Sequence, residues 1–416
     1  MIPFIAFEFD MTKGVFLPKR LNVTIIVLDT LRQDAFNRIT QRHPNLLDGI
    51  GMHFFDNCIA PGSWTLPSHA SLFTGLYQSD HNCHETSQIK SLDIDRIRLR
   101  MPTIVDDLKR KKYFTYAISA NPYIGPIYGF SGFDKYEEES YFTDVYGSVL
   151  EISKELKPRV SKYRDTYGND IMKLASAIIK EDPRLFLDLA SSAALLSPMA
   201  VAKKAKAKFI DKWPIEKGGR RIVKKVGKME LKEPFFLFLN LMEAHDPYIG
   251  GRGNDMNWAT PFLKNRVDES RVKKWKEIYN AASYRALKYA SQIMRDLIER
   301  FGENQIIILT SDHGQEFGEH NFIGHGTVIS DEVVKVPLAI HVPKDFKIDN
   351  NNYQSLVNIR EFVNSAAFGI KDSPKKLCTR RVYSEAFSIP ANISSVKGID
   401  PRLVRKFDKY KRRVFD

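Results

Sequence analysis

Reactive side chains follow several apolar runs along this chain of 416 residues. They are Asp29 after residues 22–28, His245 shortly after residues 234–240, and Asp312 and His313 after residues 305–310. Continuous apolar runs of this length are typical of strands that are buried on both faces. Because parallel strands present their carboxyl ends at one edge of a sheet, we expect these carboxylates and imidazoles to gather there.

A hydroxyl group, that of Thr65, stands just before a predicted helix of residues 68–73. Pro67 suits the first turn of that helix, and Gly75 suits its end. The unpaired N–H groups of a helix start favour an anionic substrate and a deprotonated nucleophile. An ordinary helix-capping role without chemistry is the better explanation of Thr65 when this stretch is taken alone, and the rest of the chain is what favours a reactive role.

The strand ends together suggest a metal site. Asp29, Asp312 and His313 offer two carboxylates and an imidazole, and the Thr65 hydroxyl completes a set for one divalent cation. Such mixed nitrogen and oxygen ligands favour Zn²⁺ or Mn²⁺, with Ca²⁺ or Mg²⁺ as alternatives. A hydroxyl bound to that cation would lose its proton near neutral pH, which would make Thr65 a candidate nucleophile.

Strands and helices alternate along the chain, which predicts an α/β fold in one large domain or two smaller ones. Further strands are expected at residues 54–60, 114–119 and 337–342, and a long amphipathic helix at 271–301. Residues 141–232 have a mostly helical pattern and resemble an insertion between strands. A polar linker follows Pro343, and the last region contains a strand candidate at residues 382–387.

The composition indicates an anionic partner in a reducing compartment. The net charge is +13 and the pI is about 9.3, which suits phosphate or sulfate esters and anionic lipid headgroups. No nucleic-acid-binding motif is apparent, so a nucleic acid is not expected. Three unevenly spaced cysteines and an N-terminus unlike a signal peptide favour a cytoplasmic protein.

One apolar segment, residues 185–202, precedes a lysine-rich stretch. Asp188, Pro198 and the short length argue against a transmembrane helix. An amphipathic helix at a membrane surface and a buried or oligomer-contacting helix are the alternatives, so peripheral membrane contact and oligomerisation both stay open.

Four sequence blocks resemble the sulfatase branch of the alkaline phosphatase superfamily, in the order that the family has them. They are residues 25–32 (IIVLDTLR), 64–75 (WTLPSHASLFTG), 236–248 (FLFLNLMEAHDPY) and 310–320 (TSDHGQEFGEH). Gly324-His325-Gly326 and residues 382–385 (VYSE) also fit. Together these blocks span most of residues 22–345.

The resemblance implies a fold. We expect a large, mostly parallel mixed sheet sandwiched by helices in a catalytic domain at residues 1–345. The helical insertion at 141–232 interrupts this domain, and a small C-terminal subdomain follows at 346–416.

The resemblance also implies roles for single residues. Asp29, Asp312 and His313 match metal ligands, and Thr65 matches the nucleophile, which also contacts the metal. His245 and His325 match positions that contact the substrate anion or the leaving group. These two histidines, with a nearby carboxylate, could also hold a second metal ion.

The chain departs from the sulfatase pattern at several positions. Sulfatases carry Cys-x-Pro-Ser-Arg, in which the cysteine or a serine becomes formylglycine, whereas this chain has Thr65-Leu-Pro-Ser-His69. Threonine is not a precursor of formylglycine. Asn121 stands where the family has a Gly-Lys-Trp-His-Leu-Gly block. We expect His69 and Asn121 to contact the substrate.

These departures resemble the phosphate-ester members of the superfamily. The sequence therefore predicts a metal-dependent hydrolase of phosphate mono- or diesters that acts through a phosphothreonine at Thr65. Two alternatives remain at this point. One is a sulfuric ester hydrolase that works without formylglycine, and the other is a phosphoglycerol-type transferase acting on lipid or cell-surface substrates.

Overall fold

A computed structural model shows the fold of the chain. It describes residues 7–10, 15–18, 20–139, 159, 163, 171–187, 189, 216–246, 248, 259–264, 268–391, 393 and 396–416. The chain forms two compact units. Unit 1 comprises Met1–Glu139, Pro214–Tyr248 and Asp255–Asp416, and unit 2 comprises Ser140–Trp213 and Ile249–Asn254.

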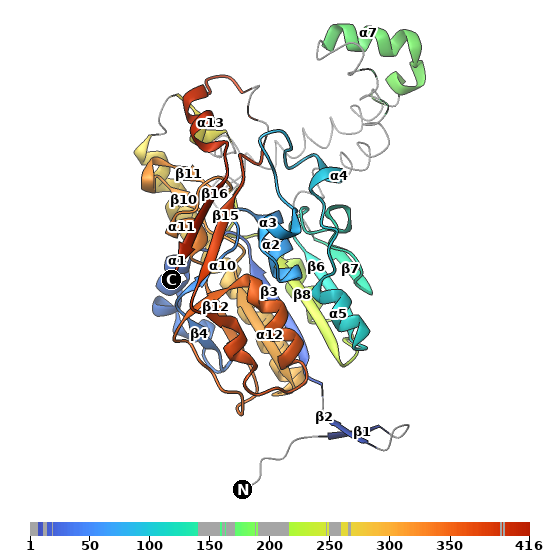
Figure 1. The fold of residues 1–416 in the computed structure, drawn as a ribbon, viewed down its shortest axis with the longest axis vertical. Helices are drawn as coiled ribbons and strands as arrows, with labels where there is room; N and C mark the ends of the chain where they lie inside the picture. Colours follow the sequence, from blue (N-terminus) through green and yellow to red (C-terminus); the bar gives the residue numbers. More distant parts are fainter. Residues whose placement is uncertain are drawn as a thin grey trace. The chain divides into compact units, whose positions relative to one another are not determined.

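The main sheet of unit 1 has seven strands among the described residues, in the order β4-β12-β9-β3-β8-β6-β7 (Figure 1). The strands are β3 (Asn22–Leu28), β4 (His53–Phe55), β6 (Phe114–Ser119), β7 (Lys135–Glu138), β8 (Phe235–Leu241), β9 (Gln305–Thr310) and β12 (Leu338–His341). Neighbours from β9 to β7 run parallel, whereas β12 runs antiparallel to both β9 and β4. The expected mostly parallel mixed sheet is confirmed.

The central strands follow from their composition. Every residue of β3, β8 and β9 is buried, and most are apolar; the polar ones are Asn22, Thr24, Asn240, Gln305 and Thr310. Strands that are covered on both faces need such sequences, because a polar side chain on either face would lose its contact with water. The positions predicted for these three strands are correct to within one residue.

The strand predicted at residues 54–60 is wrong as a single element. The structure has two short strands there, β4 in the main sheet and β5 (Cys58–Ile59), which pairs with β13 (Tyr353–Ser355) in a separate sheet. Asp56 and Asn57 between them are exposed and polar. The chain bends at these two residues, so the apolar positions on either side serve different sheets.

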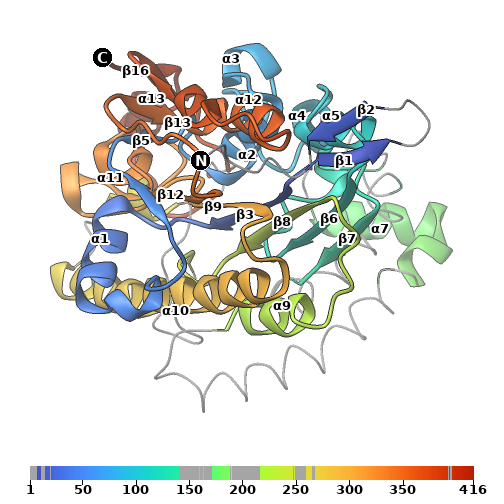
Figure 2. The same ribbon diagram turned by 90° about the horizontal axis from the view of Figure 1, so that it is seen from below.

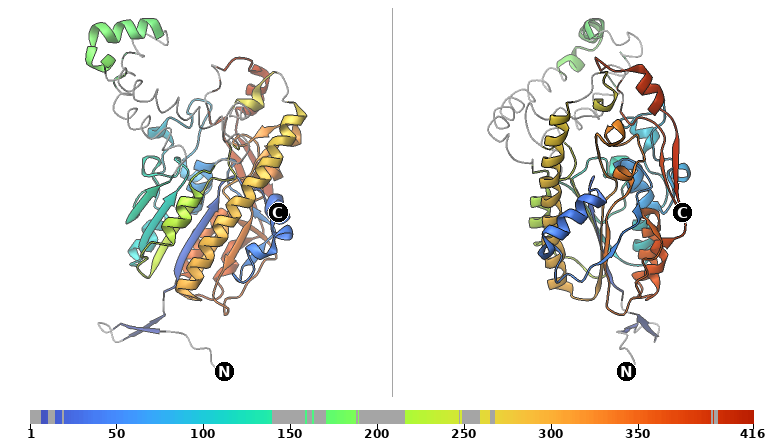
Figure 3. Two further views of the ribbon diagram at one scale, coloured as in Figure 1. Left: turned by 180° about the vertical axis from the view of Figure 1, so that it is seen from behind. Right: turned by 90° about the vertical axis from the view of Figure 1, so that its left-hand side faces the viewer.

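Helices cover both faces of the main sheet (Figure 2). The α-helices described in unit 1 are α1 (Gln33–Arg42), α2 (Thr65–Thr74), α3 (Gln78–His81), α4 (Ile94–Ile97), α5 (Ile104–Arg110), α9 (Gly219–Val226), α10 (Glu269–Phe301), α11 (Asp331–Val334), α12 (Ile359–Ala366) and α13 (Pro401–Phe407). One face carries α1, α9 and α10, and the other carries α2, α5 and α12. Figure 3 shows the long helix α10 running beside the sheet.

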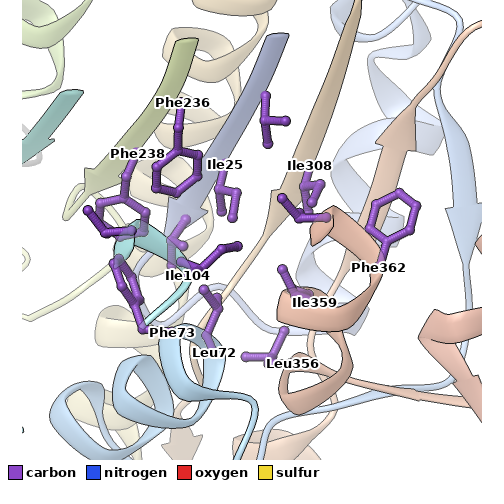
Figure 4. Close-up of a cluster of buried hydrophobic side chains, with 14 of the residues drawn as sticks. Ile25, Leu72, Phe73, Ile104, Phe236, Phe238, Ile308, Leu356, Ile359 and Phe362 are labelled. Atoms are coloured by element: carbon purple, nitrogen blue, oxygen red, sulfur yellow. The ribbon is translucent and has the colours of Figure 1, made fainter. Parts of the chain in front are cut away.

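The largest hydrophobic cluster fills the space between the sheet and the α2, α5 and α12 layer (Figure 4). Ile25 and Ile308 project from neighbouring strands, and Phe73 of α2 packs against Phe238 of β8 at a ring distance of 4.9 Å. Burying each such side chain contributes about 1.5–3 kcal/mol. This packing holds α2 firmly against the sheet, which matters because α2 begins at Thr65.

Smaller sheets complete the described part of unit 1. They are β1 (Phe7–Asp10) with β2 (Val15–Pro18), β10 (Glu316–Phe317) with β11 (Ile323–Gly324), β5 with β13 and β14 (Cys378–Thr379), and β15 (Val382–Ala386) with β16 (Lys411–Phe415). The C-terminal segment 346–416 thus contributes β13 to β16, α12 and α13, and its contacts group it with unit 1. The strand expected at 382–387 is β15.

The insertion expected at 141–232 lies partly outside the described residues. Its described portion includes α7 (Ile171–Glu181) of unit 2 and α9 of unit 1, which contacts α10. Most of the apolar segment 185–202 also lies outside the described residues. Among the helices that the structure does describe, none has both the length and the apolar character needed to cross a bilayer.

Candidate active site

The candidate site lies at the carboxyl ends of the central parallel strands. Asp29 directly follows β3, and Asp312 lies two residues after the end of β9. Asn240 of β8 is paired with Val27 of β3, so it lies at the same level of the sheet. Asn121 follows β6 by two residues. Parallel register therefore brings these four side chains to one edge, where the sequence predicts Asp29 and Asp312 to meet.

Asp29, Asp312 and His313 form a buried cluster. The His313 Nε2 atom lies 3.4 Å from Asp312 Oδ2 and 3.9 Å from Asp29 Oδ1. All three side chains are fully buried, and each offers a ligand atom within 4.8 Å of the others. Burial and the neighbouring Asp312 carboxylate raise the pKa of Asp29, and burial raises the pKa of Asp312. The neighbouring histidines offset these shifts only in part, so the two negative charges are incompletely compensated by the protein.

The tautomer of His313 follows from its partners. Its Nδ1 lies 2.9 Å from the carbonyl oxygen of Gly314. A carbonyl only accepts hydrogen bonds, so Nδ1 must carry the proton, and Nε2 presents its lone pair to the two carboxylates. Burial lowers the pKa of His313 to about 4, which keeps the imidazole neutral at pH 7. This is the form in which histidine binds a metal ion.

These observations fit a divalent cation. Asp29 Oδ1 and Asp312 Oδ2 are buried and have no hydrogen-bond partner, although both oxygens belong to carboxylates. Leaving such oxygens unpaired is costly, whereas a cation among them would satisfy both. Two carboxylates and a neutral imidazole form a donor set typical of Zn²⁺ or Mn²⁺.

Thr65 lies at the first position of α2, not before it as the sequence predicts. Helix α2 begins at Thr65, and Trp64 is its N-cap residue, in an extended conformation. The expected end is confirmed, because Gly75 adopts the left-handed conformation with φ of 69°. Since Pro67 lies in the first turn and has no N–H of its own, it costs this helix start no hydrogen bond.

The Thr65 hydroxyl faces the cluster. Its Oγ1 lies 3.3 Å from His313 Nε2, and Asn121 Nδ2 donates to it at 3.3 Å. Asn121 Nδ2 also donates to Asp29 Oδ2 at 2.7 Å. Asn121 therefore connects the expected nucleophile with an expected metal ligand. The sequence did not predict this positioning contact, and the substrate contact expected of Asn121 stays a prediction.

His69 lies one turn further along α2 and is fully buried. Its Nδ1 donates to the Thr65 carbonyl oxygen at 2.9 Å and lies 3.5 Å from Asp312 Oδ2. The ring packs edge-on against Phe238 at 5.9 Å. These contacts fix the first turn of α2 against the sheet. The substrate contact expected of His69 stays a prediction.

His245 and His325 approach the cluster from a second side. Their ring centres lie 5.0 Å apart, and the His325 ring lies 4.5 Å from that of His313. Burial and the two neighbouring histidines lower the pKa of His325 well below its ordinary value. His245, His325 and Asp246 form a further group that could hold a metal ion, in line with the second-metal alternative.

Two functional positions were missed in the sequence. Asn240 Nδ2 lies 3.5 Å from both Asp29 Oδ2 and His69 Nε2, and Gln315 Oε1 accepts from His325 Nδ1 at 2.5 Å. Asn240 has a detectable signal, since it is the one polar residue in the apolar strand β8. No sequence signal marks Gln315, because its partner His325 lies ten residues further along the chain.

The fold therefore places a buried group of carboxylates and histidine, which could hold a metal ion, beside the Thr65 hydroxyl at the start of α2. Residues 22–369 match the sequence profile of the Sulfatase family. This match covers well over half of the chain, so the chain belongs to the sulfatase family, whose members bind a divalent metal ion. No curated protein sequence matches the chain significantly.

Several solved structures are similar in fold. The C-terminal periplasmic domain of EcEptC from Escherichia coli, in complex with Zn, has a TM-score of 0.52 and 10% identity, with 92% of each chain covered. A 2-O GAG sulfatase has a TM-score of 0.50 and 14% identity, covering 89% of this chain and 78% of the other. A phosphonate monoester hydrolase from Silicibacter pomeroyi has a TM-score of 0.48 and 15% identity, covering 95% and 89%. At these identities, the first two similarities support the fold alone.

Proposed function

We propose that the chain is a metal-dependent phosphoric ester hydrolase in which Thr65 is the nucleophile. The observation that carries this proposal is the position of an unmodified threonine hydroxyl at the start of α2, 3.3 Å from His313 Nε2 and beside the buried carboxylates. Sulfatases generate formylglycine from cysteine or serine at this position. Threonine cannot be converted to formylglycine, so we expect the Thr65 alkoxide to attack phosphorus directly.

The proposed metal ligands are Asp29, Asp312 and His313, with Thr65 beside them. A divalent cation held there would lower the pKa of a neighbouring hydroxyl and neutralise anionic oxygens of the substrate. Asn121 and the carbonyl contact of His69 would hold the hydroxyl in place. The first N–H groups of α2 would face a bound anion, because a helix start leaves them without intrahelical acceptors.

The reaction would proceed in two balanced steps. Thr65 Oγ1, after losing its proton to solvent, forms a bond to phosphorus as the bond from phosphorus to the leaving oxygen breaks, and the leaving oxygen takes a proton from the protonated form of His325 or His245. Water then attacks the phosphothreonine, the same histidine accepts its proton, and Thr65 is released. Burial keeps His325 neutral in the free protein. An anionic substrate beside it would raise its pKa, so that the imidazole could take up a proton and pass it to the leaving oxygen.

Membership of the sulfatase family supports sulfate ester hydrolysis as the second candidate. The two candidate functions can be distinguished by measuring the hydrolysis of p-nitrophenyl phosphate, its bis-ester and p-nitrophenyl sulfate, each with added Zn²⁺ or Mn²⁺. We expect a kcat/KM for at least one phosphate ester that exceeds that for the sulfate by about 100-fold or more, roughly 3 kcal/mol of transition-state discrimination. Faster turnover of the sulfate than of both phosphates would overturn the proposal.

A brief quench with the phosphate substrate gives a second readout. The Thr65 peptide should carry a phosphate adduct in tandem mass spectrometry, and the adduct should be absent without substrate. Adding an acceptor alcohol tests the transferase alternative, because a transferase would divert phosphate from water to the alcohol. Turnover that requires the alcohol would replace hydrolysis by transfer as the function.

A further inference from the structure

A separate group of ionisable side chains lies just beyond the candidate active site. It consists of Glu316 in β10, His320 in the short 3-10 helix Glu319–Asn321 that follows, and Glu332 in α11, and we name it the Glu316 cluster. His320 Nδ1 lies 3.0 Å from Glu316 Oε1 and 3.5 Å from Glu332 Oε2. Each residue offers a ligand atom within 4.8 Å of the others. The reaction proposed above uses none of the three.

The carboxylates of this cluster are incompletely satisfied. Glu316 is 0% exposed and its Oε2 has no hydrogen bond of good geometry, although the nearby Ser330 hydroxyl and His320 oppose the rise of the Glu316 pKa. Glu332 Oε2 is also buried without a hydrogen bond. A buried carboxylate oxygen without a hydrogen bond is costly, and the His320 ion pair to Glu332 Oε2 at 3.5 Å satisfies it only weakly, so both oxygens favour a further positively charged group nearby.

The neighbouring cations are bound elsewhere. Glu319 Oε1 forms ion pairs with Lys276 Nζ at 2.8 Å and with Arg32 Nη1 at 3.0 Å. Among the described residues, His320 is therefore the only basic side chain that pairs with Glu316 or Glu332. Burial and the nearby carboxylates of Glu332 and Glu319 raise the pKa of Glu316. The negative charge of the cluster is thus poorly compensated without a further cation.

We propose that the Glu316 cluster is a second divalent-cation site, separate from the Asp29, Asp312 and His313 group, with Zn²⁺ as its preferred occupant. Ligand atoms placed tetrahedrally around zinc at its usual bond lengths lie about 3.3 Å from one another. The two distances from His320 Nδ1 bracket this value. Two carboxylates and one imidazole favour Zn²⁺ over Ca²⁺, and the side chain of His320 is 63% exposed, which leaves room for a water ligand.

An ion here would support the active site without taking part in it. The Gly314 and Gln315 N–H groups donate to the backbone oxygens of Val333 and Glu332 at 2.7 Å and 3.0 Å. Cross-linking β10 to α11 would therefore fix the segment that carries Gln315, the partner of His325. The inference does not depend on the reaction proposed for Thr65, because it concerns metal content and stability.

The test is zinc stoichiometry in the full-length chain. The protein is stripped with a chelator, dialysed against buffered Zn²⁺, and its bound zinc is measured by elemental mass spectrometry. We expect His320→Ala and Glu332→Gln each to bind one zinc ion per chain fewer than the wild type. His53→Ala is the matched control, since His53 is exposed and belongs to none of the candidate metal groups. It should bind as much zinc as the wild type.

Asp29→Asn separates the two sites. This variant should lose the ion of the candidate active site and keep the ion of the Glu316 cluster, and the double variant Asp29→Asn/His320→Ala should lose both. Equal zinc content in the wild type, His320→Ala and Glu332→Gln would overturn the proposal. Loss of all zinc from a folded His320→Ala, with folding checked by circular dichroism, would overturn it too, because the cluster would then serve the active site alone.

Discussion

At the scale of single residues, the proposed chemistry depends on Thr65. Its hydroxyl is held between the Asn121 amide and the His313 imidazole, and His69 holds its backbone. The same side chains fit a structural role only poorly, because they leave Asp29 Oδ1 and Asp312 Oδ2 buried without hydrogen bonds. An arrangement that is costly to fold is best explained by what it binds.

Removing the Thr65 hydroxyl gives the sharpest residue-scale prediction. Thr65→Ala should lower kcat/KM for the phosphate ester by at least about a thousandfold, because the proposed covalent bond forms at the Thr65 hydroxyl. Zinc content should fall little, since both carboxylates and His313 remain. Thr65→Ser keeps a hydroxyl and is the matched control, with much of the activity retained. Activity of Thr65→Ala close to that of wild type would exclude Thr65 as nucleophile.

The pH dependence of stability contains a second residue-scale prediction, at His81. This buried imidazole donates from Nε2 to Ser71 Oγ at 2.9 Å and accepts from the Cys83 N–H at Nδ1, also at 2.9 Å. Burial, with a contribution from His84, lowers the pKa of His81 to about 3. Protonation of Nδ1 would break the bond from Cys83, so the folded chain resists it.

The sign follows from linkage. The unfolded chain binds a proton at His81 near pH 6.5 and the folded chain only near pH 3, so the stabilisation is complete above pH 6.5 and is lost as pH falls toward 3. Between pH 7 and pH 5 this one group should remove roughly 2 kcal/mol from the free energy of unfolding. His81→Gln should reduce the loss measured by denaturant titration, whereas His53→Gln should leave it unchanged. A pH dependence identical in wild type and His81→Gln would contradict the assignment.

At the scale of elements, close backbone approaches fix the candidate ligands. Gly314 follows His313, and a Cβ placed on it would lie 2.1 Å from the Glu332 carbonyl oxygen. The segment after β9 can therefore lie against α11 only with glycine at this position. The left-handed φ of 61° at Thr30 is a second local feature, and the Thr30 N–H donates to Asp312 Oδ1 at 3.2 Å.

Gly314→Ala is the element-scale prediction. The backbone must move, which should lower the free energy of unfolding by about 2 kcal/mol or more and weaken zinc binding by displacing His313. Gly227→Ala is the matched control, because φ is −63° there and the nearest atom lies 3.6 Å from the added Cβ. Equal stability and zinc affinity in the two variants, measured by denaturation and zinc titration, would show that the close approach at Gly314 is not limiting.

At the scale of the whole molecule, the net charge of +13 bears on substrate capture. An excess of positive charge attracts anions over about 10 Å at 0.1 M salt, and this attraction is screened as salt increases. We therefore expect kcat/KM for an anionic phosphate ester to fall about three- to tenfold between 20 and 200 mM NaCl, with a smaller change in kcat. A neutral osmolyte at equal osmolarity is the control. A salt-independent kcat/KM would show that the net charge does not act at the site.

The α/β class, the buried strands and the residue types at the strand ends could all be predicted from the amino-acid sequence. This was possible because strands covered on both faces must be apolar and their reactive ends then stand out. Only the tertiary structure decided which of these residues meet. Parallel register sets Asn240 level with Val27, and the packing of α2 on the sheet turns Thr65 toward His313. Three further features could not be predicted from the sequence: the split of residues 54–60 between two sheets, the partner of His325, and the Glu316 cluster. Each depends on contacts between separate segments, and no periodic pattern in the sequence indicates such contacts.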